Sequence, residues 1–165
     1  MAELNGAVRR ECARFGGREL PAAGAALMAT FSSPSRAVAC AAAVREAGVA
    51  LGLAVRTGIH TGECAVVGDH LSGPPMRMSS CLAVLAGPGQ VVVTSTVKDL
   101  IGGTHLTFTP CGTHRLVGST AEWALFTVDE RRTTGSPANE HRTGPTPAPG
   151  PAADMAPSGG PPADG

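Results

Sequence analysis

Two segments of the sequence carry proline where a helix would begin and glycine where it would end. These start and stop signals are the features that most constrain the fold. In residues 32–48, SSPSRAVACAAAVREAG, Ser33 can cap a helix, Pro34 suits its first turn and Gly48 can end it. Residues 73–89, GPPMRMSSCLAVLAGPG, repeat the arrangement. Both segments space their apolar side chains at helical intervals. The chain therefore contains at least two amphipathic helices.

Short apolar segments bounded by turn residues surround these helices and predict strands. Strands are expected within residues 17–23, 25–31, 53–63, 64–71, 90–95, 106–118 and 122–130, with the end of a helix at 3–17 and a short helix at 96–103. The first two strands would form a hairpin. Helices that alternate with strands in this way predict an α/β or α+β fold with a mixed sheet.

The composition changes near Val128 and predicts two regions. Residues 1–130 carry the apolar segments, whereas residues 131–165 hold eight of the 14 prolines and are otherwise rich in Gly, Ala, Ser and Thr. Such a stretch has too little apolar surface to offset the entropy lost on ordering. We expect a disordered tail, in which GPTPAPGP (144–151) could serve as a polyproline ligand.

Charge and residue pattern exclude several classes of protein. The formal net charge is zero, which argues against a strongly basic nucleic-acid binder. The five cysteines form no CxxC pair and the five histidines are scattered, so no zinc site is expected. The N-terminus lacks the apolar core of a signal peptide, and the longest apolar run, residues 37–44, is too short to span a bilayer. We expect a cytoplasmic protein with no membrane segment.

Three segments, in their order and spacing, give the sequence a family resemblance. They are VRTGIHTGE (55–63), AVLAGPGQVVVTSTVKDL (83–100) and GTHRLVGSTAEWALFTV (112–128). Together they resemble the class III adenylate/guanylate cyclase catalytic domain, most closely the actinobacterial type. The resemblance covers residues 8–128.

The resemblance implies a ferredoxin-like sheet flanked by helices, dimerisation, and conversion of ATP or GTP to a cyclic nucleotide and pyrophosphate. Two aspartates would hold two Mg²⁺ or Mn²⁺ ions on the triphosphate. The first aspartate belongs to an N-terminal strand in the middle of the sheet, and this chain starts after that strand. We therefore expect that the sheet closes differently, that another chain supplies a strand, or that the fold is marginally stable.

At the positions for metal and purine recognition, the sequence departs from the family. The second metal aspartate falls at Ala25, which has no oxygen ligand to offer. The purine-reading lysine falls at Pro21, and the purine-reading aspartate falls at His70, beside Asp69. The resemblance therefore implies no metal cofactor here, and it leaves the choice between ATP and GTP open.

The catalytic positions on the second predicted helix and near the C-terminal strands also differ from the family pattern. The ribose-positioning asparagine falls at Arg77, the transition-state arginine at Cys81 and the phosphate-binding lysine at Val117. No catalytic residue of the family is therefore retained at the aligned positions. Arg77, Asp69 and His70 remain as candidate nucleotide-binding residues, with Arg77 as a phosphate ligand.

These departures predict a degenerate, catalytically inactive cyclase-like domain. Its leading role would be dimerisation or regulation in cyclic-nucleotide signalling, as a homodimer or a heterodimer with a related cyclase. Three alternatives stay open: a sensor that binds ATP or GTP without turnover, a residual cyclase within a larger assembly, and a gene remnant.

Overall fold

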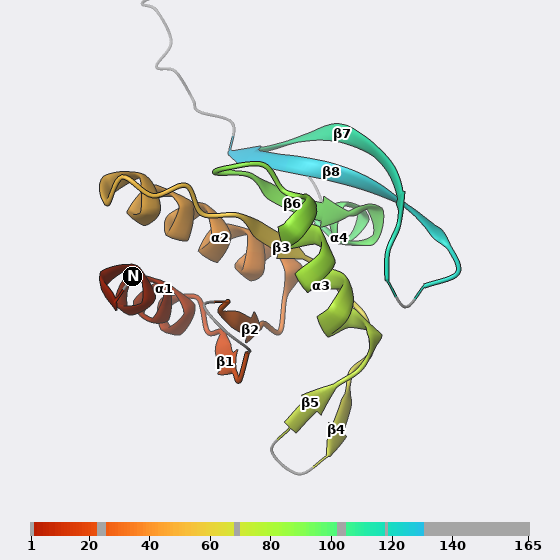
Figure 1. Ribbon diagram of the computed structural model, residues 1–165, viewed down its shortest axis with the longest axis horizontal. Helices are drawn as coiled ribbons and strands as arrows, with labels where there is room; N and C mark the ends of the chain where they lie inside the picture. Colours follow the sequence, from red (N-terminus) through yellow and green to blue (C-terminus); the bar gives the residue numbers. More distant parts are fainter. Residues whose placement is uncertain (1, 23–25, 68–69, 102–104, 118, 131–165) are drawn as a thin grey trace, which may run out of the picture. The chain divides into compact units, whose positions relative to one another are not determined.

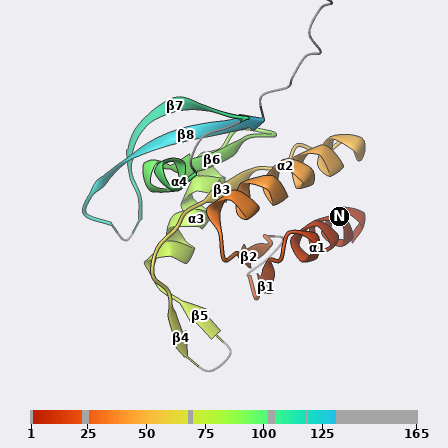
Figure 2. The same cartoon turned by 180° about the vertical axis from the view of Figure 1, so that it is seen from behind.

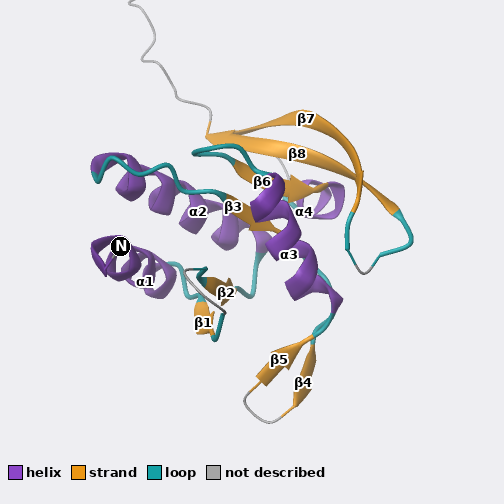
Figure 3. Ribbon diagram, viewed as in Figure 1, coloured by secondary structure: helices purple, strands orange, loops and turns teal. Residues whose placement is uncertain are grey.

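The protein is described by a computed structural model that covers residues 2–22, 26–67, 70–101, 105–117 and 119–130. Helices and strands are distributed along the whole of this part (Figures 1 and 3). In chain order they are α1 (Ala2–Arg14), β1 (Arg18–Leu20), β2 (Met28–Thr30), α2 (Pro34–Ala50), β3 (Thr57–Ile59), β4 (Ala65–Val67), β5 (His70–Ser72), α3 (Pro74–Leu85), β6 (Val91–Thr94), α4 (Ser95–Leu100), β7 (Leu106–Arg115) and β8 (Glu122–Glu130). The predicted α+β class with a mixed sheet is confirmed.

The main sheet has four strands in the order β3-β6-β8-β7. Strand β6 runs parallel to β3, with Gly58 opposite Val92, and antiparallel to β8, with Val93 opposite Phe126. All four residues of β6 are buried. This explains why QVVVTS reads as a continuous apolar run: a strand covered on both faces has no polar side.

Helices cover both faces of this sheet. On one face, Val38 and Ala41 of α2 and Val97 of α4 pack against Val91 and Val93. On the other face, α3 packs against Val92, and its buried residues there are Met78 and Leu82. The alternation along β6 follows from the pleat of a strand, which sends successive side chains to opposite faces.

Helices α1 and α2 lie side by side, as both views show (Figures 1 and 2). Their contact forms a third apolar cluster, made by Cys12 of α1 with Cys40 and Val44 of α2. Phe15 and Phe31 pack against it. The cluster attaches α1 and the hairpin β1–β2 to α2, because Ala29 of β2 also contacts it.

The prolines predicted the starts of two helices correctly, whereas the glycine at position 48 did not predict the end of α2. Helices α2 and α3 begin at Pro34 and Pro74, as predicted. Helix α2, however, continues past Gly48 to Ala50, and the residue with positive φ, +71°, is Gly52. Gly48 is buried, and a β-carbon there would lie 2.7 Å from a methyl group of Val55. Close packing, rather than helix termination, therefore accounts for Gly48.

One strand expectation is wrong in detail. The segment 64–71, predicted as one strand, instead contributes to two antiparallel strands, β4 and β5, with Val66 opposite Leu71, and its residues 68 and 69 lie outside the described part. This hairpin forms a two-stranded sheet of its own. Among the described helices, none is both long and apolar enough to cross a lipid bilayer.

Candidate functional site: a groove between two sheets

Among the described residues, β1 and β2 form a two-stranded sheet separate from the main sheet. Strand β2 pairs with β1, and β3 pairs with β6. Between β2 and β3 lies a groove of about 730 Å³. Its walls include Met28–Phe31 from β2 and the residue after it, and Val55–Gly62 around β3. The groove is therefore bordered by one free edge of each strand.

Four helices complete the groove, and α4 contributes Val97 alone among the lining residues. Helix α1 contributes Leu4, Asn5, Val8 and Cys12; α2 contributes Pro34, Ala37, Cys40, Ala41 and Val44; and α3 contributes Pro75, Met76, Ser79, Ser80, Ala83 and Val84. Most of these side chains are small or aliphatic. The volume lies in the 300–1,000 Å³ range of ligand sites.

Charge is nearly absent from the groove. Among the residues that line it, Arg56 carries the single formal charge, and none is aspartate, glutamate or lysine. Two of its hydroxyls are satisfied within α3, because Ser79 Oγ donates to the carbonyl oxygen of Pro75 at 3.0 Å and Ser80 Oγ to that of Met76 at 3.1 Å. The groove therefore suits an uncharged, largely apolar occupant.

His60 is held at the end of β3 by two neighbours. Its Nδ1 lies 3.0 Å from Thr94 Oγ1, and Thr94 is fully buried at the end of β6. Its ring meets the Trp123 ring edge-on, with centroids 5.1 Å apart, and Trp123 Nε1 donates to Ser119 Oγ at 3.0 Å. Burial lowers the pKa of His60, because desolvation disfavours the imidazolium. These contacts join β3, β6 and β8 through His60, which indicates a structural role for this residue.

Arg77 and Cys81 occupy successive turns of α3 but differ in surroundings. Arg77 is exposed, and within the described residues it forms no hydrogen bond or ion pair by its side chain. Cys81 is half-buried and packs, with Trp123, against the cluster around Leu82. Neither residue lines the groove.

The other sequence candidates are not brought to one place by the described structure. Ala25 and Asp69 lie outside the described residues. His70 begins β5, and its position is described by its backbone register opposite Val67. Pro21 is exposed just after β1, and Val117 is 68% exposed after β7.

The sequence did not predict the groove. The signal for it in the sequence was the pair of thiols on its wall, Cys12 and Cys40. Cys12 and Cys40 sit on the apolar stripes of two helices, and their sulfur atoms are 3.8 Å apart. Burial raises the pKa of Cys12, and it raises that of Cys40 to about 12. These are buried core thiols whose raised pKa disfavours the reactive thiolate. No group of three or more His, Cys, Asp or Glu side chains that could hold a metal occurs within the described part of the chain.

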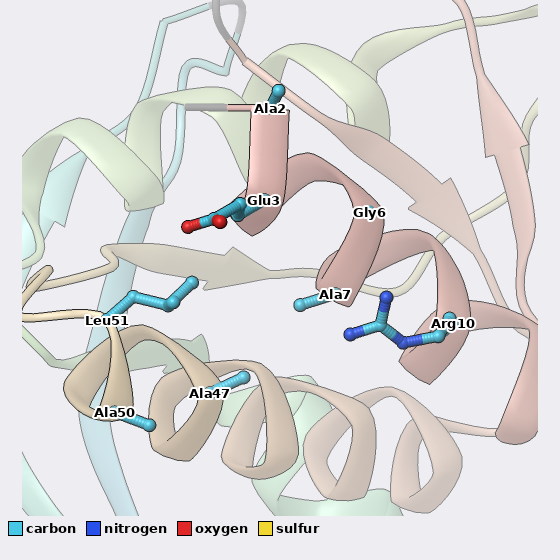
Figure 4. A pocket seen from close by; sticks show the side chains of 8 residues that line it. All are labelled: Ala2, Glu3, Gly6, Ala7, Arg10, Ala47, Ala50 and Leu51. Carbon is cyan, nitrogen blue, oxygen red and sulfur yellow. The ribbon is translucent and has the colours of Figure 1, made fainter.

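A second hollow, of about 610 Å³, lies between the start of α1 and the end of α2 (Figure 4). Its floor is formed by Ala7 and Ala47, with Glu3 and Arg10 toward its two ends. The residues that line it are mainly alanine and glycine and offer no convergent set of polar groups. It resembles a surface depression between two packed helices more than a binding site.

Comparison with solved structures identifies the fold. An adenylate cyclase of Trypanosoma brucei in its monomeric state aligns with a TM-score of 0.71 and 20% identity, covering 77% of each chain. The guanylate cyclase domain of RhGC from Catenaria anguillulae, in complex with GTP, aligns with a TM-score of 0.66 and 18% identity, covering 79% of this chain and 82% of that one. An adenylate/guanylate cyclase/hydrolase from Silicibacter pomeroyi gives a TM-score of 0.68 at 18% identity, over 77% and 80%. The chain has the adenylate/guanylate cyclase fold.

Comparison with curated sequences finds partial matches. The serine/threonine-protein kinase pkn2 of Myxococcus xanthus is 28% identical over 129 residues, which are 73% of this chain and 15% of the kinase. An uncharacterized protein of Mycobacterium tuberculosis is 35% identical over 81 residues, or 48% of this chain and 32% of that protein. The chain thus spans a third or less of the length of these relatives. No family model matches the sequence.

Proposed function

We propose that the protein is a non-catalytic, degenerate relative of the class III nucleotidyl cyclases and acts as an association or regulatory module in cyclic-nucleotide signalling. The fold shared with cyclase domains supports the family assignment. The partial matches to mycobacterial proteins support the actinobacterial type. A dimeric guanylyl cyclase domain among the structural neighbours, from Blastocladiella emersonii, supports association with a second cyclase-like chain.

The observation that carries the proposal is that position 81 holds a cysteine, whose side chain is half-buried. This position corresponds, by the family resemblance, to the arginine that stabilises the transition state. A half-buried thiol packed against the cluster around Leu82 cannot supply a guanidinium to a phosphate. In phosphoryl transfer an arginine of this kind contributes about 10³–10⁵ in kcat. This loss alone would leave catalysis very weak, and Ala25 would remove a metal ligand in addition.

The direct test is a cyclase assay on the full chain. Purified protein is incubated with ATP or GTP and Mn²⁺, and cyclic nucleotide is measured by mass spectrometry. The expected product equals that of a heat-denatured sample. Turnover above that background would overturn the non-catalytic assignment.

Association is tested on the same protein by sedimentation velocity. We expect a concentration-dependent dimer, or a heterodimer after mixing with a related cyclase. A chain that stays monomeric in both experiments contradicts the association role, whatever the cyclase assay shows.

Nucleotide sensing without turnover is the second candidate, favoured by the exposed Arg77. An arginine without a described partner, in the first turn of α3, is free to bind a phosphate bidentately. Calorimetric titration with ATP and GTP should then show binding that Arg77→Ala weakens by about tenfold, or about 1.4 kcal/mol. Arg36→Ala, at an exposed position in the first turn of α2, is the matched control. Equal affinities in both variants would exclude Arg77 as the phosphate ligand, and the absence of binding with either nucleotide would exclude the sensor.

A further inference from the structure

We infer that Cys12 and Cys40 are a redox pair, which a peroxide oxidises to a disulfide that joins α1 covalently to α2. The inference rests on the positions of the two thiols and does not depend on the proposed function. A reducing thiol would break the disulfide again, so the covalent link between the two helices would be reversible.

The two thiols meet at the contact between the helices. Their sulfur atoms are 3.8 Å apart, and a disulfide needs about 2.05 Å between its sulfur atoms. The residues are 28 positions apart in the sequence, so the bond would close a loop that contains the hairpin β1–β2. Among the described residues, which include all five cysteines, this is the one pair of thiols joined by a hydrogen bond.

The surroundings of the pair favour a bond within it over a bond to any other thiol. Cys12 is 8% exposed and Cys40 is 4% exposed, and the apolar side chains of Val44, Phe15 and Phe31 belong to the same cluster. A second protein cannot reach sulfur atoms buried in this way, whereas hydrogen peroxide is small and uncharged and enters through local opening of α1. Once one sulfur is oxidised, the adjacent thiol is the nearest nucleophile, and its proximity accelerates the second step.

The hydrogen bond between the thiols gives them different roles. Cys40 Sγ donates to Cys12 Sγ, which favours a thiolate at Cys12. Burial raises the pKa of Cys12 and the bond from Cys40 offsets part of that rise, whereas burial raises the pKa of Cys40 to about 12. Cys12 is therefore the residue that attacks the peroxide, and Cys40 is the residue that closes the disulfide. Because both pKa values are raised, the reaction is slow at neutral pH.

The oxidation proceeds in two steps. The Cys12 thiolate attacks one oxygen of hydrogen peroxide, the O–O bond breaks, hydroxide leaves and Cys12 becomes a sulfenic acid. Cys40, as its thiolate, then attacks the Cys12 sulfur, so that the S–S bond forms, the S–O bond breaks and a second hydroxide leaves. The two hydroxides take up the two protons that the thiols have lost. Two thiols and one peroxide thus give one disulfide and two water molecules, and two electrons pass from sulfur to oxygen.

The test uses the full chain, fully reduced and then exposed to hydrogen peroxide under native conditions at pH 8.5. Intact mass and peptide mapping should show the loss of two hydrogen atoms and a link between Cys12 and Cys40. The link should form at a rate independent of protein concentration and should disappear when dithiothreitol is added. Oxidation products that contain no link between these two cysteines would overturn the inference.

The structural effect of the link is measured by amide hydrogen exchange. Exchange in α1 should slow at least threefold after oxidation, with little change in β7, because the helix can no longer separate from α2. Dithiothreitol should restore the original rates. Equal exchange of α1 in the reduced and oxidised forms would overturn the inference that the disulfide fixes this helix.

Two variants separate the roles of the thiols, and a third is the matched control. In Cys40→Ala, Cys12 should accumulate as a sulfenic acid that dimedone traps, whereas in Cys12→Ala the labelling of Cys40 should be at least tenfold slower. Equal labelling of the two residues would overturn their assigned roles. Cys64→Ala, which removes a half-buried thiol elsewhere, should form the link within twofold of the natural rate. If an alanine variant fails to fold, the mapping and exchange measurements on the natural chain still decide the inference.

Discussion

Cys12 and Cys40 place their sulfur atoms 3.8 Å apart across the contact between α1 and α2. Both residues are more than nine-tenths buried. Burial in an apolar cluster disfavours the thiolate, which raises the pKa of Cys40 to about 12. This pair attaches α1 to the rest of the fold, and its protonation therefore affects stability.

The Cys40 thiol should make the protein less stable in alkali. Because the folded-state pKa is raised, its contribution is fully present below the unfolded pKa of about 8.5 and is lost as pH rises toward 12. Urea unfolding at pH 7 to 10.5 should show this decline. In Cys40→Ala the free energy of unfolding should fall less steeply with pH, because this thiol no longer contributes. In Cys64→Ala, which removes a half-buried thiol elsewhere, the decline with pH should be unchanged. An unchanged slope in Cys40→Ala would contradict the assignment.

Gly58→Ala should destabilise the fold strongly. A β-carbon at Gly58 would meet the backbone of Ser79 and Ala83 in α3, neither of which can move independently of the helix. Overpacking of this kind costs about 1–3 kcal/mol. Gly6→Ala is the control, because its nearest atom is a flexible Arg10 nitrogen at 3.7 Å and alanine favours a helix by up to about 1 kcal/mol. Urea denaturation measures both, and equal stabilities would show that α3 is not held against β3.

His60 should couple stability to acid. Its pKa is lowered by burial, so its contribution is present above about pH 6.5 and is lost as pH falls through the folded pKa. Thermal unfolding at pH 7.5 and 5 should show a larger loss for the natural chain than for His60→Gln. Trp123, the one tryptophan, lies beside this ring and reports it by fluorescence. A variant with an identical pH profile would exclude His60 as the titrating group.

The sequence predicted those parts of the fold that depend on local signals. Pro34 and Pro74 begin their helices because proline pre-sets the backbone of a first turn and needs no N–H there. The buried stripe of Met78 and Leu82 and the apolar run of β6 follow from helical and strand periodicity. The end of α2 was misplaced because Gly48 serves packing against Val55, a contact that no local pattern encodes.

The site could not be predicted in the same way, because it depends on pairing across long distances in the sequence. The groove exists because β2 and β3, 27 residues apart in their numbering (from 30 to 57), pair with other strands on their far sides. The His60–Thr94–Trp123 contacts likewise join three strands. The packing of Cys81 against the cluster around Leu82 likewise needed the structure, because that cluster joins α3 to distant strands.

Manganese should leave any nucleotide binding unchanged. The two-metal arrangement implied by the family resemblance needs carboxylates, and the described residues hold no group of three or more potential metal ligands. Thermal shifts produced by GTP should therefore agree within about 1 °C with and without Mn²⁺, after subtraction of the effect of Mn²⁺ alone. Arg77→Ala, which alters the one candidate phosphate ligand on α3, should reduce both shifts equally if a nucleotide binds. A ligand that binds the folded state raises the unfolding temperature in proportion to its occupancy. A GTP-induced thermal shift that requires Mn²⁺ would therefore demonstrate a surviving metal site and overturn the degenerate assignment.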